Sequence, residues 1–251
     1  MRAARTPRYA GSVSDPADPP HVVIDADGAE LRLVLRRHPR ARRVSLRADA
    51  RSGDIVLVLP RRAALQTALG FARSQAHWIR ARLAQVPPAM PFADGAVVEI
   101  LGVPLTIRHD PALRGPATRD GDFLRVGGAP EFVARRVRDF LRAEALRLFA
   151  PLAEAKASTI GRRVVALRVA DTRSRWGSCA RGGKLSFSWR LVLAPATVVD
   201  YVVAHEVAHL AHHDHGPAFW LLVDRLTPHR ASAQPWLRGN GIRLLRAGLV
   251  C

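Results

Sequence analysis

Three histidines and one glutamate constrain this chain more than any other feature of its sequence. His205, Glu206 and His209 form the pattern H-E-x-x-H, and a third histidine, His215, follows six residues after His209. Because positions i and i+4 of a helix lie on one face, the first two imidazoles can bind the same cation. His215 completes a three-histidine set with an open fourth position, which is typical of catalytic zinc. Glu206 stands beside the first ligand, where it can reach a metal-bound water.

The residues around this pattern favour a buried helix. Those nearest to it are apolar or nearly so: Val198, Val199, Tyr201, Val202, Val203, Val207, Ala208 and Leu210. Burying three ionisable side chains in so apolar a helix is costly unless a metal or other partners bind them. The alternative is a core helix whose histidines only make hydrogen bonds, and the apolar surroundings count against it.

The identity of the third ligand depends on where this helix ends. We expect a helix over residues 196–212, followed by a turn that brings His215 back toward the same cation. His212 and His213 are competing candidates, because they lie three and four residues after His209. His215 is preferred, since a ligand from the following turn approaches from a different direction, as tetrahedral coordination requires.

Composition limits the class of protein. A chain of 251 residues that is 48% hydrophobic can build one large domain or two small ones. Cys179 and Cys251 are too few for a disulfide framework, which fits a reducing compartment. Residues 1–21 lack the apolar core of a secretory signal, and no apolar run approaches the roughly 18 residues of a transmembrane helix. We therefore expect a soluble, cytoplasmic protein with no membrane partner.

The net charge of +18 comes almost entirely from arginine, since Lys156 and Lys184 are the only lysines. A GC-rich genome explains the preference for arginine over lysine, but it does not explain the excess of positive charge. The densest cluster of arginines contains Asp49 as its only acid and consists of Arg32, Arg36, Arg37, Arg40, Arg42, Arg43, Arg47 and Arg51. Such a cluster predicts contact with nucleic acid or nucleotides, because guanidinium groups bind phosphate well. A solvated basic face is the alternative.

Turn signals and hydrophobic periodicity predict an α+β fold. Residues 1–20 are expected to form a disordered tail, residues 21–128 a β-rich N-terminal part, and residues 129–251 a catalytic α+β part. The expected strands are 22–24, 31–35, 44–46, 55–59, 97–101, 104–108, 123–126, 164–169 and 185–193. The expected helices are 61–85, 130–161, 196–212, one that begins at 216–217, and 231–238. Residues 110–122 are expected to form a polar loop.

A second unusual segment lies between the last two expected strands. Residues 173–179 combine two arginines, Arg173 and Arg175, with Trp176 and Gly177. The tryptophan can anchor such a loop, and the glycine allows a bend without steric strain from a Cβ atom. The arginines could face a cleft, where they would stabilise a developing oxyanion or hold a phosphate. An exposed turn with a packed tryptophan is the alternative.

Together, these segments resemble the YgjP-like metallopeptidase domain. The resemblance covers roughly residues 22–240 and is sharpest over 170–222, where R-W-G-S-C precedes H-E-x-x-H and H-G-P-x-F-W follows it. That family is similar to the SprT-like and Wss1-like zincins. The resemblance therefore implies a zinc-dependent hydrolase with a zincin-like catalytic domain.

The resemblance also implies roles for individual residues. It makes His205, His209 and His215 ligands of one zinc ion per chain, and Glu206 the catalytic carboxylate. The family usually has asparagine just before the third histidine, whereas Asp214 stands there in this chain. This aspartate could accept a hydrogen bond from a ligand imidazole, or it could be an ordinary turn residue.

Three functions remain open at this point. The preferred one is a zinc metallopeptidase in which Glu206 is the general base and Arg173 or Arg175 stabilises the oxyanion. The second is a metal-dependent pyrophosphatase of nucleoside triphosphates such as UTP, an activity linked to some YgjP-like proteins. The third is a nucleic-acid-binding module with a vestigial metal site. SprT-like and Wss1-like relatives act on proteins bound to DNA, which would suit the net charge of +18.

Overall fold

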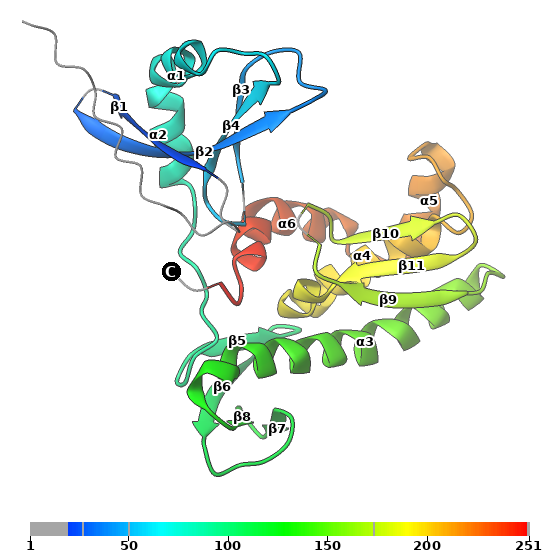
Figure 1. Cartoon of the computed structure of the whole chain (residues 1–251). Helices are drawn as coiled ribbons and strands as arrows, with labels where there is room; N and C mark the ends of the chain where they lie inside the picture. The colour runs from blue at the N-terminus through cyan, green and yellow to red at the C-terminus, as the bar shows by residue number, and fades with distance from the viewer. Residues whose placement is uncertain (1–19, 27, 50, 173, 250–251) are drawn as a thin grey trace, which may run out of the picture. The chain divides into compact units, whose positions relative to one another are not determined.

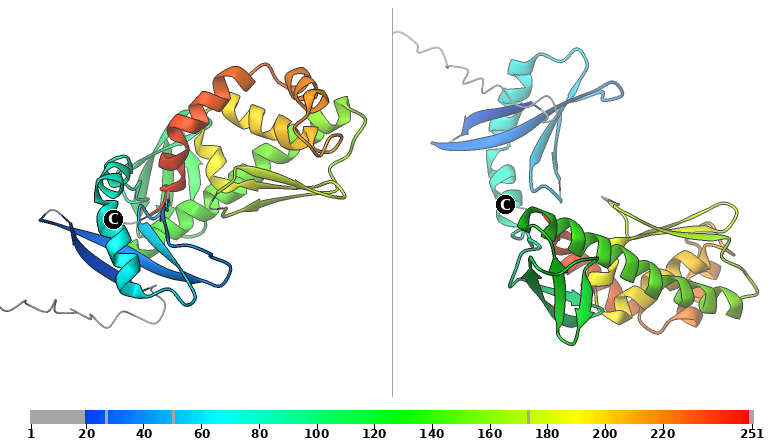
Figure 2. Two further views of the ribbon diagram at one scale, coloured as in Figure 1. Left: turned by 90° about the horizontal axis from the view of Figure 1, so that it is seen from above. Right: turned by 60° about the horizontal axis from the view of Figure 1, so that its bottom comes forward.

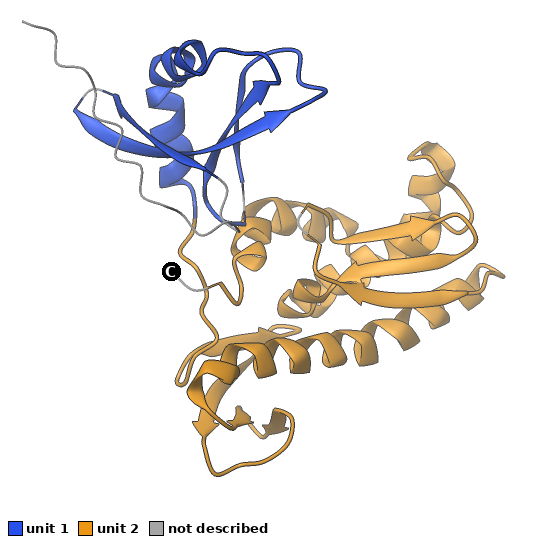
Figure 3. Cartoon of the chain, viewed as in Figure 1, with its two compact units in different colours: residues 1–86 blue, residues 87–251 orange. Residues whose placement is uncertain are grey.

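A computed structural model describes residues 20–26, 28–49, 51–172 and 174–249. The expected N-terminal tail, apart from Pro20, lies outside these residues, as do Arg173 and Cys251. The expected α+β fold is confirmed, because helices accompany three small mixed sheets. The chain divides into two compact units, residues 1–86 and residues 87–251 (Figure 3).

The first unit is built on a four-stranded sheet with the order β1-β2-β4-β3 (Figure 1). Its strands are β1 (His21–Ala26), β2 (Ala29–His38), β3 (Ser45–Ala48) and β4 (Ile55–Pro60). Strand β4 pairs in parallel with β2 and antiparallel with β3. Alternate residues of β2 and β4, such as Leu33 and Leu57, are buried on one face, as the period of two in a strand requires.

Two helices cover that buried face, α1 (Leu65–Ser74) and α2 (Ala76–Ala84). The sequence predicted one helix over 61–85, and this prediction was wrong because Gln75 leaves the helical conformation, with φ −103° and ψ 15°. The break turns buried residues of both helices, including Ala72 and Ile79, toward the same core. The spacing of apolar residues does not reveal an interruption of a helix at a single residue.

The second unit begins with another four-stranded sheet, in the order β5-β6-β8-β7. Its strands are β5 (Val97–Ile100), β6 (Val103–Asp110), β7 (Thr118–Asp120) and β8 (Phe123–Gly127). The predicted hairpin around Gly102 is confirmed, and Leu101 and Gly102 both have positive φ angles, of 53° and 84°. The segment expected to be wholly a polar loop contains β7, a short exposed strand whose three residues offer no apolar pattern.

A long helix, α3 (Val133–Thr159), follows a 3-10 turn, η1 (Pro130–Phe132), and continues through Pro151. It runs beside α4 (Ala196–Ala208), the helix that contains the H-E-x-x-H glutamate, along the second unit (Figure 2). Buried residues of the sheet β5–β8, such as Leu105 and Leu124, belong to the same hydrophobic core as Leu141 of α3. This shared core explains why the units divide after Val86, whereas the sequence analysis drew its boundary after residue 128.

A three-stranded sheet lies against the helices, in the order β10-β11-β9. Its strands are β9 (Ala166–Ala170), β10 (Gly177–Ala180) and β11 (Lys184–Ser188). The predicted strand 185–193 was too long, because a 3-10 helix, η2 (Trp189–Leu193), replaces its second half. The preceding segment, 173–179, was expected to be a loop. Its last residues instead belong to β10, which pairs antiparallel with β11.

Three further helices complete the second unit: α4 (Ala196–Ala208), α5 (Pro217–Leu226) and α6 (Arg230–Leu245). Helix α4 packs against α3, α5, α6 and β10, so it is buried on nearly every side. It ends four residues earlier than expected. Helix α6 is much longer than the expected 231–238, because Leu244 and Leu245 pack into the core beyond Gly239 and Gly241. Among the described residues, no helix has the length and apolarity needed to cross a membrane.

Candidate metal centre

The end of α4 brings the predicted ligands together. His205 lies on the last helical turn, and His209 is the residue that caps the helix. The chain then turns through residues 210–214, and His215 returns to face the helix. The three side chains offer ligand atoms that all lie within 4.8 Å of one another. Among the described residues, this is the single group of histidine, cysteine and acidic side chains compact enough to hold a metal ion.

The spacing of the ring nitrogens fits one tetrahedral ion. The Nε2 atoms of His205 and His215 are 3.2 Å apart. Two ligands at the usual zinc–nitrogen distance, seen at the tetrahedral angle, would be separated by about 3.3 Å. The ligand atoms of the three histidines are up to 4.8 Å apart, so a modest inward rotation of one ring is needed for all three to bind one ion. The residues present therefore suit a divalent cation.

A hydrogen bond to the backbone orients His209. Its Nδ1 atom lies 2.9 Å from the carbonyl oxygen of His212, which leaves Nε2 directed at the centre. His212 thus contributes its backbone to the site, and neither its ring nor that of the exposed His213 belongs to the cluster. The geometry favours His215 over both competing candidates.

Burial favours the neutral form of two of the imidazoles, those of His205 and His209, which is the form that a metal ligand needs. Burial, followed by the proximity of His209 and His215, lowers the pKa of His205 to about 4. Burial also lowers the pKa of His209, although the hydrogen bond to His212 opposes this shift. Neutral imidazoles present free lone pairs, so few protons compete with a cation near neutral pH.

Two aromatic residues of α5 form a wall behind the histidines. The ring of Phe219 stacks on His209, with centroids 4.5 Å apart, and lies 4.7 Å from the ring of His215. Trp220 packs beside His215, at 5.6 Å between centroids. In the sequence these two residues stood out only as the F-W of H-G-P-x-F-W, with no role assigned to them. Their spacing of four and five residues after His215 was the available signal.

Glu206 is a buried carboxylate beside the cluster. It is 6% exposed, and burial raises its pKa to about 7, with the charge of Arg175 opposing the shift. The side chain points toward β10, where a Cβ atom at Gly177 would lie 2.6 Å from its Oε1 atom. A protonatable group with a pKa near neutrality, on the residue that follows His205 in α4, is suited to general acid–base chemistry.

The segment before β10 therefore contributes to the site, but not as the sequence suggested. Gly177 was expected to permit a bend, yet it needs no positive φ angle and is instead required by its close contact with Glu206. Trp176 packs against Gly241 of α6, which confirms its anchoring role. Arg175 is exposed and close enough to Glu206 to affect its charge, whereas Arg173 lies outside the described residues.

Three other polar residues of the second unit, Asp200, Cys179 and Asp214, do not belong to the histidine cluster. Asp200 forms an ion pair with Lys156 of α3, at 2.7 Å, and accepts a hydrogen bond from Thr227. Cys179 lies near Glu206 but is not part of the histidine cluster. Asp214 is exposed and makes no hydrogen bond to a ligand imidazole among the described residues, so it is a turn residue here.

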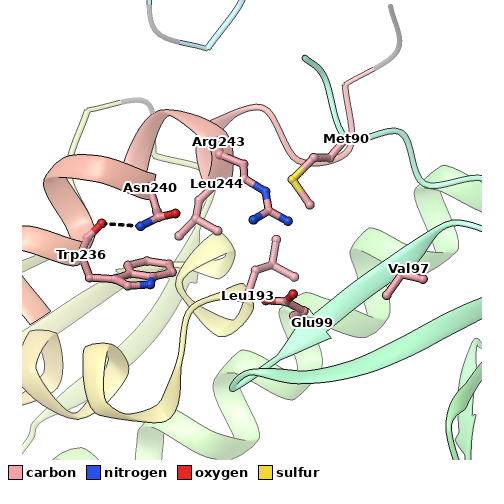
Figure 4. Close-up of a pocket in the computed structure, with 8 residues that line it drawn as sticks. All are labelled: Met90, Val97, Glu99, Leu193, Trp236, Asn240, Arg243 and Leu244. Carbon is pink, nitrogen blue, oxygen red and sulfur yellow. Dashed lines mark hydrogen bonds between the residues drawn. The ribbon is translucent and has the colours of Figure 1, made fainter. Parts of the chain in front are cut away.

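A separate pocket of about 220 Å³ lies between α6, β5 and η2 (Figure 4). Glu99 and Arg243 project into it from opposite sides, and Trp236 and Asn240 close one end. It includes none of the three histidines. The chemistry expected from the sequence is therefore located at the end of α4 and not in this pocket.

Comparison with known proteins identifies the family of this chain. The family model described as YgjP-like, metallopeptidase domain matches residues 42–240, which is most of the chain. The matched segment contains the whole histidine cluster and β10. Searches of curated proteins and of solved structures gave no match.

Proposed function

Because the chain belongs to the YgjP-like metallopeptidase domain family, we propose that it hydrolyses peptide bonds at one zinc ion held by His205, His209 and His215. The family implies a metal-dependent peptidase with a divalent ion. The histidine cluster suits zinc in particular, since three imidazoles and an open position are typical of catalytic zinc. The observation that carries the proposal is the buried Glu206 carboxyl beside this cluster, with its pKa raised to about 7.

When bound, a zinc ion supplies Lewis acidity, which polarises a carbonyl group and makes a water molecule more acidic. Glu206 then acts as the general base, accepting the proton of the attacking water on a carboxylate oxygen. It returns this proton to the nitrogen of the leaving amine. The guanidinium of Arg175, which already acts electrostatically on Glu206, would stabilise negative charge on the former carbonyl oxygen.

The position of β10 supports a peptide substrate over a nucleotide. This strand lies at one edge of its sheet and, within the described residues, pairs on one side only (Figure 1). An extended peptide can add to such an edge through main-chain hydrogen bonds. Since Gly177 of β10 adjoins Glu206, a peptide bound along this edge would pass beside the carboxylate.

The proposal is tested by comparing substrates with a matched pair of variants. The zinc-loaded protein is incubated separately with casein and with UTP, alongside Glu206→Gln and Glu154→Gln. Glu154 is an exposed carboxylate of α3 and serves as the control. We expect peptide cleavage by the wild type and by E154Q, and zinc binding without cleavage by E206Q.

Two results would contradict the proposal. Release of pyrophosphate from UTP without peptide cleavage would indicate the nucleotide hydrolase instead. Binding of nucleic acid with no hydrolysis of either substrate would indicate a vestigial metal site.

A further inference from the structure

The open face of the sheet in the first unit carries a regular set of basic side chains. In β2 and β4, residues 33, 35, 55, 57 and 59 face the helices, so their neighbours in sequence face the other way. Across β4, Val58 is paired with Arg36 of β2 on one side, and Val56 is paired with Arg47 of β3 on the other. Two arginines therefore flank an apolar strip along β4.

This face is hollowed and strongly positive. A cavity of about 660 Å³ is bounded by β2, β3, β4 and the connection between β2 and β3. We call it the arginine hollow, and its lining consists of Arg36, His38, Arg40, Ala41, Arg42, Arg43, Ser45, Arg47, Ala48, Asp49, Val56 and Val58. Asp49 is the one acid in this lining, and its Oδ1 atom accepts hydrogen bonds from the backbone N–H groups of Arg51 and Ser52.

The guanidinium groups of the hollow are available to a ligand. The guanidinium groups of five exposed arginines form no ion pair and no hydrogen bond with any described residue. These arginines are Arg36, Arg40, Arg42, Arg43 and Arg47. By contrast, the neighbouring Arg37 donates hydrogen bonds to the carbonyl oxygens of Pro60, Arg61 and Ala63. Five like charges around one hollow create a positive potential that attracts a polyanion.

We propose that the arginine hollow binds the phosphate backbone of a nucleic acid duplex without regard to its sequence. Guanidinium groups bind phosphate oxygens in bidentate fashion, and protein–DNA interfaces are polar and positively charged. Binding through phosphates alone carries no sequence information. The proposal concerns the first unit only and is independent of the hydrolytic activity.

The lining distinguishes the duplex from other polyanions. Protein interfaces have an apolar and aromatic core from which charged residues are depleted, whereas the arginine hollow has no phenylalanine, tyrosine or tryptophan. Binding of single strands depends on a series of aromatic side chains that stack on successive bases, whereas the lining offers only the imidazole of His38. Its small apolar floor, Val56 and Val58, is largely covered. A rigid, closely spaced array of phosphates fits these features best.

The test measures affinity for a labelled DNA duplex of mixed sequence by fluorescence anisotropy across a range of salt concentrations. The hollow variant carries Arg36→Gln, Arg43→Gln and Arg47→Gln. The control variant carries Arg114→Gln, Arg142→Gln and Arg162→Gln, which removes the same charge from exposed positions of the second unit. For the hollow variant we expect a log–log salt slope smaller by about 2.7, and binding that is therefore weaker by a factor of about 500 at about 0.1 M salt if the two proteins bind equally at about 1 M.

A further variant separates loss of charge from loss of folding, and further ligands separate duplex binding from binding of other polyanions. A triple Arg→Lys variant at the same three positions retains the charges and should keep most of the salt slope, which separates lost charge from lost folding. Equal weakening in the hollow and control variants would overturn the proposal, because it would reflect net charge alone. Tighter binding of a single strand, or displacement of the duplex by polyglutamate of equal charge, would also overturn it.

Discussion

The backbone of Gly177 lies against the side chain of Glu206, so closely that a Cβ atom at Gly177 would fall 2.5 Å from the Glu206 Cγ atom. A separation under 3 Å is not tolerated by real Cβ atoms, so any larger residue here must displace the carboxylate or the strand. This contact joins the edge strand β10 to helix α4 at the residue proposed as general base. It therefore determines where the carboxylate sits.

Substituting Gly177→Ala should reduce peptide hydrolysis by about 100-fold while zinc binding is kept, since a displacement of about 1 Å is enough to misalign a catalytic group. Activity assays and metal analysis of the same preparation measure both effects. Gly239→Ala is the control, because a Cβ atom there meets nothing within 4 Å. An active Gly177→Ala variant would show that the contact does not position Glu206.

Glu206 should make the metal-free protein less stable as the pH rises. Its pKa is raised from 4.5 to about 7 by burial, so between these values the folded state holds a proton that the unfolded chain has lost. Stability therefore falls through this window, and about 3 kcal/mol is lost once the pH exceeds 7. Glu206→Gln has no such loss.

This pH effect is measured by urea unfolding of the metal-stripped wild type and of Glu206→Gln. The difference in unfolding free energy should widen in favour of the variant by about 3 kcal/mol between about pH 4 and pH 8.5. The histidines, whose lowered pKa values act in the opposite direction, are common to both proteins and cancel in the comparison. A constant difference would mean that the Glu206 carboxyl is not buried as described.

The ion pair between Asp200 and Lys156 should contribute measurably to stability. It links α4 to α3, and Asp200 also accepts a hydrogen bond from Thr227 after α5. Asp200→Ala leaves the ammonium of Lys156 without its ion-pair partner, and we expect a loss of about 2–3 kcal/mol, below the range for a fully buried pair. A double-mutant cycle with Lys156→Ala isolates the coupling. A coupling near zero would contradict this role.

Features with a fixed spacing along the chain could be predicted from the sequence. The i, i+4 histidines specified one helical face, and the turn signals at Gly216 and Pro217 specified the start of α5, so the cluster could be predicted. The break at Gln75 and the change from strand to 3-10 helix at Trp189 could not. Both occur where the spacing of apolar residues continues unchanged.

The contacts that complete the site were also beyond the sequence. Gly177 was expected only to permit a bend, because the residues around it in sequence do not indicate that the Glu206 side chain of α4 approaches it. Phe219 looked like an ordinary core residue, although its ring stacks on His209. Such contacts between distant segments depend on the tertiary arrangement, which a single sequence does not contain.

The most direct test of the metal centre is anomalous X-ray diffraction from zinc-loaded crystals, recorded at the zinc absorption edge. We expect one peak per chain, about 2.0–2.1 Å from a ring nitrogen of each of His205, His209 and His215. The same experiment on His215→Ala should lose or weaken the peak, whereas His213→Ala should retain it. A peak at His212 or His213, or the absence of a peak among the three histidines, would contradict the account.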